Sequence, residues 1–171
     1  MREIIPSLRR LAILGNVTGA SVVAEITEAR EAARTLGLEV VVSELHRADD
    51  INPAIKALKG HADALYVCGG YLTLQTRKQI VDLVAQQQLP AMYAFREFVE
   101  EGGLMSYAAN LVDVYRRAAT YVDKILRGAT PAELPIEQAR KVELVLNLKT
   151  AQAVGVTFPP TLLLLADEVI R

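Results

Sequence analysis

Leu11-Ala12-Ile13-Leu14 is a continuous apolar run that ends at Gly15-Asn16. A run without polar alternation is typical of a strand that is buried on both faces of a parallel sheet. From residue 21 to residue 36 the apolar side chains recur at helical spacing, which predicts a helix directly after this strand. We expect Ser21 to cap that helix and Glu25 to lie on its outward face.

The alternation of strand and helix continues along the chain. Further elements are expected in chain order as a strand at 38–42, a helix at 51–58, a strand at 64–68, a helix at 73–88, a strand at 91–94, a helix at 95–101, a strand at 104–107, a helix at 113–126, a strand at 142–148, a helix at 150–154 and an apolar tail. Such alternation implies right-handed crossovers. The predicted fold class is therefore α/β, a three-layer α/β/α Rossmann-like lobe with a mostly parallel sheet.

Bulk composition limits the class of protein. The chain has 171 residues, which suits a single domain spanning 1–171. Its 19 basic and 20 acidic side chains give a net charge of −1, so no basic surface is expected to bind nucleic acid. The longest apolar stretch, 158–166, contains two prolines and is too short for membrane insertion. We find no signal-peptide pattern after Met1.

Ligands of open parallel sheets bind at the carboxyl ends of the strands, where loops and helix amino termini converge. Three loops therefore carry the predicted ligand-binding residues. These are Asn16, Thr18, Gly19, Ala20 and Ser21 after the first strand, Gly69, Gly70, Tyr71 and Thr73 after the third, and Arg96 and Glu97 after the fourth.

Each loop also has a purely structural interpretation. The amide, hydroxyls and helix-start N–H groups of the first loop suit a carboxylate, but Asn16 and Ser21 are equally suited to a turn and a helix cap. In the second loop Tyr71 offers an aromatic wall beside paired glycines, and the alternative is a flexible turn capped by Thr73. Arg96 is expected to contact ligand or to pair with its neighbour Glu97.

The sequence gives no positive indication of catalysis. A nucleophile elbow, a P-loop and a zinc motif are absent, and His46 and His61 have no metal-ligand partner at a suitable spacing. The only cysteine, Cys68, excludes an internal disulfide. We therefore predict no catalytic residue, no metal site, no cofactor and no enzymatic activity.

Two long segments, Phe95 to Tyr107 and Tyr115 to Ala129, resemble the ABC-transporter substrate-binding family related to tryptophan-binding proteins. The likeness continues in Leu134 to Gln138, Leu146 to Ala151 and Pro159 to Ile170. It implies the second lobe of a type I periplasmic binding protein, with 104–128 as the segment that crosses to a first lobe. It also implies that the first two loops contact an amino acid or another small organic solute. The solute would be delivered unchanged to an ABC permease, in the periplasm or another extracytoplasmic space.

Without a first lobe, the apolar face of the helix around Tyr115 to Leu126 lacks a covering surface, which predicts a homo-oligomer with this helix exchanged between subunits. Two alternatives stay open. One is a truncated structural or sensor lobe that oligomerises without ligand. The other is a Rossmann-like nucleotide-binding enzyme that uses Gly15 to Ser21 as a phosphate loop and Glu44 to bind the ribose, although the glycine spacing is not that of the dinucleotide fingerprint.

Overall fold

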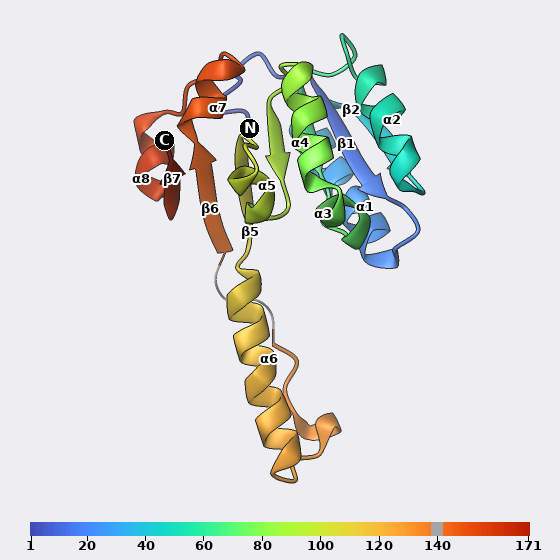
Figure 1. The fold of residues 1–171 in the computed structure, drawn as a ribbon, viewed down its shortest axis with the longest axis vertical. Helices are drawn as coiled ribbons and strands as arrows, with labels where there is room; N and C mark the ends of the chain where they lie inside the picture. The colour runs from blue at the N-terminus through green and yellow to red at the C-terminus, as the bar shows by residue number, and fades with distance from the viewer. Residues whose placement is uncertain (138–141) are drawn as a thin grey trace.

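A seven-stranded sheet forms the body of the protein in the computed structural model, which describes residues 1–137 and 142–171 (Figure 1). The strands are β1 (Arg10–Asn16), β2 (Glu39–Leu45), β3 (Ala64–Val67), β4 (Ala91–Tyr93), β5 (Met105–Ala109), β6 (Val142–Asn147) and β7 (Glu168–Ile170). Their order across the sheet is β2-β1-β3-β4-β5-β6-β7. Strands β1 to β5 pair in parallel, β6 is antiparallel to β5, and β7 is parallel to β6. The predicted, mostly parallel sheet is confirmed.

Helices cover both faces of this sheet. They are α1 (Ala20–Thr35), α2 (Ile51–Ala57), α3 (Tyr71–Gln75), α4 (Arg77–Gln86), α5 (Arg96–Glu100), α6 (Leu111–Leu126), α7 (Leu148–Ala153) and α8 (Pro160–Leu165), with short 3₁₀ turns η1 (Ala48–Asp50) and η2 (Pro131–Glu133). On one face α1 packs through Val22 and Ile26 against Ile13 of β1. On the other, α2, α4 and α5 pack in one apolar cluster with Leu14 and Leu65. The three-layer α/β/α prediction is therefore confirmed.

Some local predictions are wrong. The helix expected over 73–88 is divided at Thr76 into α3 and α4, because Thr76 leaves helical geometry and its hydroxyl donates to the carbonyl of Leu72. Helix α1 begins one residue before Ser21, and Gly19 is its N-cap, so Ser21 lies in the first turn. The apolar tail contains α8 and β7, which are too short to show a periodic pattern.

Helix α6 leaves the body and projects away from it (Figure 1). It has 16 residues, none of them buried, and is about 24 Å long at 1.5 Å per residue. Asn110 caps it by accepting a hydrogen bond of 2.8 Å from the N–H of Asp113. In the described part of the chain, no helix combines the length and apolarity needed to cross a membrane. The run Leu134 to Gln138 singled out in the sequence ends at Gln138, which lies outside the described residues.

Asp63 ties the start of β1 to the start of β3. Its carboxylate accepts hydrogen bonds from the N–H groups of Arg9 and Arg10 at 3.1 and 2.8 Å, and from the Arg10 guanidinium at 2.7 Å. The Arg10 side chain, followed by the two backbone donors, lowers the pKa of Asp63 below its usual value.

We predict that Asp63→Asn lowers the free energy of unfolding at neutral pH. Because the pKa of Asp63 is depressed in the folded state, its contribution is present above about pH 4 and is lost as the pH falls through the folded value. Urea unfolding of both proteins measures the difference, which should shrink towards zero in acid. Asp49→Asn, at an exposed position, is the control. A difference that persists unchanged in acid would contradict the assignment.

Candidate ligand-binding site

A cleft opens at the carboxyl ends of β3, β4 and β5, where the loops after β3 and β4 meet the end of β5 and the first two turns of α1 and α6. Its volume is ≈ 550 Å³, a size that suits a small organic molecule. The lining residues are Ser21, Glu25, Tyr66, Gly69, Gly70, Tyr71, Leu74, Ala94, Phe95, Tyr107, Ala108, Leu111 and Tyr115. The cleft therefore lies at the edge of the sheet predicted from the sequence.

Glu25 is the charged side chain among these lining residues, and it is held by two elements outside its own helix. Its Oε1 accepts a hydrogen bond of 2.6 Å from the hydroxyl of Tyr66 on β3. The N–H of Gly69, in the loop after β3, donates to both carboxylate oxygens at 3.1 Å. A carboxylate offers about four acceptor positions, so the group keeps capacity for a further donor in the cleft. The sequence prediction that Glu25 faces outward is wrong, because Tyr66 and Gly69 draw it towards the sheet.

Aromatic rings make up much of the remaining wall. The chain has six Tyr and three Phe, and five of these nine residues line this one cleft, namely Tyr66, Tyr71, Phe95, Tyr107 and Tyr115. Tyr71 is 82% exposed, so its ring stands at the mouth of the cleft. Such a wall favours a ligand with a flat or apolar side chain.

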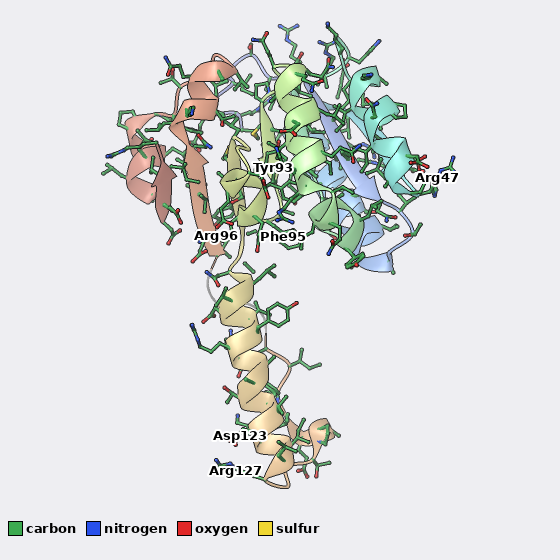
Figure 2. All side chains as sticks on the ribbon, in the orientation of Figure 1. Arg47, Tyr93, Phe95, Arg96, Asp123 and Arg127 are labelled. Carbon is green, nitrogen blue, oxygen red and sulfur yellow. The ribbon has the colours of Figure 1, made fainter. Side chains whose placement is uncertain are left out.

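Gly69 makes the position of Phe95 possible. A Cβ atom at Gly69 would lie 2.9 Å from the Phe95 ring, which is closer than real side chains approach. The ring therefore packs directly over the backbone of the loop that also donates to Glu25. Phe95 and its neighbour Arg96 lie at the edge of the body from which α6 projects (Figure 2).

The predicted site residues divide into two groups. Ser21, Gly69, Gly70 and Tyr71 line the cleft. The other predicted residues are not among its lining residues; they are Asn16, Thr18, Gly19, Ala20, Thr73, Arg96 and Glu97.

The residues outside the cleft have structural partners of their own. Asn16 accepts hydrogen bonds from the N–H and hydroxyl of Thr18 at 2.9 and 2.6 Å, which matches the turn interpretation of the first loop. Gly19 is the N-cap of α1, and Ala20 is its first residue. Thr73 is fully buried, and its hydroxyl donates to the carbonyls of Cys68 and Gly70.

Arg96 does not pair with Glu97 as predicted. Its guanidinium contacts Glu100 at 3.0 Å, Glu143 at 3.3 Å and Glu168 at 2.6 Å, so it joins α5 to β6 and β7. Glu143 also accepts a hydrogen bond of 2.7 Å from the side chain of Asn110, the cap of α6. These contacts fix the points where the chain leaves the body and returns to it. The prediction considered only the sequence neighbour Glu97, whereas the carboxylates that pair with Arg96 lie one helical turn further on, at Glu100, and on β6 and β7.

A model of the family described as ABC transporter substrate binding protein matches residues 1–170. The chain belongs to this family. The resemblance seen in the sequence is thereby confirmed, and it extends over nearly the whole chain.

Relatives and solved structures agree with the family and the fold. A tyrosine-binding protein of Clostridioides difficile is 18% identical over 153 residues, which cover 90% of this chain and 44% of that protein. A conserved domain protein of Vibrio cholerae superposes with a TM-score of 0.93 at 23% identity, over 98% of this chain and 57% of that one. An ABC domain in complex with L-Trp from Streptococcus pneumoniae superposes with a TM-score of 0.94 at 22% identity, over 99% of this chain and 57% of that one. This substrate-binding family member thus spans about half the length of the relatives it matches.

The sequence missed most of the cleft's distinctive residues. Glu25 lies inside a helix and Tyr66 inside a strand, so neither follows a strand end, which was the signal used to find the site. Tyr107 and Tyr115 belong to the segment that leads into α6. One signal could have identified these residues. Once the order of the strands is known, several tyrosines are seen to lie near the carboxyl ends of neighbouring strands. Among the residues that the structure describes, we find no cluster of side chains suited to a metal ion.

Burial, followed by the hydrogen bond to Glu25, raises the pKa of Tyr66 well above the usual tyrosine value. We predict that the wild-type protein loses stability as the pH rises through about 10, where the unfolded chain releases the Tyr66 proton and the folded protein keeps it. Tyr66→Phe should flatten this loss, measured as the free energy of unfolding between about pH 8 and about pH 11. Equal slopes in the two proteins would refute the assignment.

Proposed function

We propose that this chain binds an aromatic amino acid in the cleft and presents it unchanged to an ABC permease, in an extracytoplasmic compartment. The observation that carries the proposal is the combination of one held carboxylate, Glu25, with five aromatic rings in a single cleft. Relatives that are complexed with L-Trp or named for tyrosine binding support this class of ligand.

Each part of an amino acid finds a complementary group. The α-ammonium would donate to the free acceptor positions of Glu25, since charge-assisted hydrogen bonds are the strongest available to it. The α-carboxylate would approach Ser21 in the first turn of α1, where N–H groups lack intrahelical partners and the helix dipole favours an anion. The side chain would lie against Phe95 and Tyr107.

The chemistry of the cleft supports binding without conversion. The lining residues supply a carboxylate, hydroxyls and rings, with neither a histidine nor a cysteine thiol among them. Cys68 lies behind the loop, fully buried, and burial raises the pKa of its thiol far above the usual value, which opposes reactivity. In the longer relatives a further part of the chain would close over the ligand, as expected for a cleft that is open on one side.

We predict that Glu25→Gln weakens binding of L-Trp or L-Tyr by roughly tenfold or more, because it removes the charge that pairs with the ammonium group. Indole-3-propionate, which lacks that group, should bind wild type and variant with similar affinity. Titration calorimetry measures both ligands, and the melting temperature without ligand reports any loss of folding.

Glu28→Gln is the matched control, because Glu28 is an exposed carboxylate on the same helix. It should leave the affinity unchanged. The proposal fails if none of the aromatic amino acids binds at millimolar concentration, or if Glu25→Gln binds L-Trp as tightly as the wild type does.

A further inference from the structure

A buried carboxylate lies behind the cleft, outside the set of lining residues. The side chain of Glu143, on β6, is 10% exposed. Its Oε1 accepts a hydrogen bond of 2.7 Å from the side-chain amide of Asn110, and its Oε2 accepts one of 3.3 Å from the guanidinium of Arg96. Burial of a charge is unfavourable unless donors replace its hydration, and these two donors do so in part. We call these three residues the Glu143 network.

Each residue of the Glu143 network adjoins a residue that lines the cleft. The adjoining lining residues are Phe95, which precedes Arg96, Leu111, which follows Asn110, and Ala108, which lies opposite Glu143 in the pairing of β5 with β6. The network therefore holds the backbone of three lining segments from behind. Because it joins α5, β6 and the start of α6, it fixes these segments relative to one another.

Asn110 connects this network to α6 through both ends of its side-chain amide. The oxygen caps α6 by accepting a hydrogen bond of 2.8 Å from the N–H of Asp113, while the nitrogen donates to Glu143. An ionised Asp caps a helix as well as Asn does, but it has no hydrogen to donate. The amide thus sets the direction in which α6 leaves the body. Leu111 and Tyr115, four residues apart on one face of this helix, both line the cleft.

Arg96 anchors the Glu143 network to the body. Its guanidinium also contacts Glu100 and Glu168, so it is held from its own helix and from β7 as well as from β6. A change at Asn110 or Glu143 therefore displaces the start of α6 while Arg96 keeps its place.

We propose that Glu143 and Asn110 are positioning residues for the ligand. They act through α6, by holding Leu111 and Tyr115 where these two side chains bound the space for the ligand. This role rests on the proposed function, because the affinity concerned is that of the same cleft. Part of that affinity depends on a hydrogen bond between two side chains that the ligand does not touch.

An exchange of donor and acceptor between the two positions tests this role. Asn110→Asp keeps the cap of α6 but sets a second carboxylate against Glu143. Glu143→Gln keeps the shape of the side chain but removes the charge and one of the two acceptor atoms. In the double variant the new amide at position 143 donates to the new carboxylate at position 110, and its oxygen still accepts from Arg96. The hydrogen bond is then restored with its direction reversed.

Titration calorimetry with L-Trp measures the effect on the cleft. Each single variant should bind L-Trp roughly fivefold or more weakly than the wild type, and the double variant should recover most of the loss. Glu100→Gln is the matched control, because it removes another carboxylate from Arg96 without touching Asn110, and it should leave the affinity unchanged. Melting temperatures without ligand report folding. A lowered melting temperature with unchanged affinity would make the network merely structural and would overturn the proposal.

A measurement without ligand reports the direction of α6 itself. Nitroxide labels on Thr120→Cys in α6 and Gln79→Cys in α4, both at exposed positions, give the distance between this helix and the body by pulsed electron paramagnetic resonance. Cys68 is fully buried, so the labels attach to the introduced thiols. The distance distribution should broaden or shift in each single variant. It should return to the wild-type distribution in the double variant and stay unchanged in Glu100→Gln.

The two measurements separate this proposal from the proposed function. A wild-type chain that binds no L-Trp would refute the proposed function alone, since the label distances would still show whether the Glu143 network sets the direction of α6. Label distances that are the same in every variant would overturn the positioning role. A double variant that binds L-Trp no better than the single variants would overturn it too.

Discussion

The hydrogen bonds that Tyr66 and the Gly69 N–H donate to Glu25 are the contacts on which the cleft depends. They join α1, β3 and the loop after β3, which are three of the elements that bound the candidate site. A half-buried carboxylate beside aromatic rings loses much of its hydration, and these donors replace part of it. Because the same loop carries the Phe95 ring on its backbone, the position of the charge and the position of the aromatic wall are set together.

The body of the fold was predictable because its signals are local. Burial on both faces gives β1 an unbroken apolar run, and Ala12, Ile13 and Leu14 are indeed fully buried. The Gly69-Gly70-Tyr71 loop was found for the same kind of reason, since it follows a strand whose carboxyl end lies at a known edge. These inferences need only the order of elements along the chain.

Glu25 was not predictable in this way. It lies four residues after Ser21 in a helix whose Glu28 and Glu31 are exposed, so helical periodicity places it with the solvated charges. Its real environment is set by Tyr66, 41 residues further along the chain. The same limit applies to Arg96, whose partners Glu143 and Glu168 are brought near only by the addition of β6 and β7 to the sheet. Periodicity identifies a face of a helix, whereas the partner of that face depends on topology.

Tyr115 connects the cleft to the projecting helix, because it lines the cleft and lies in α6 with its side chain 72% exposed. The root of α6 is held to the body by the contacts of Asn110 and Arg96 with Glu143, so the backbone that carries Tyr115 leaves the body at a fixed point beside the cleft. Any surface that covers Tyr115 on α6 therefore changes what a ligand meets in the cleft. Thermodynamic linkage makes this effect reciprocal: a ligand that orders the Tyr115 ring must alter, by the same factor, the affinity of α6 for whatever covers it.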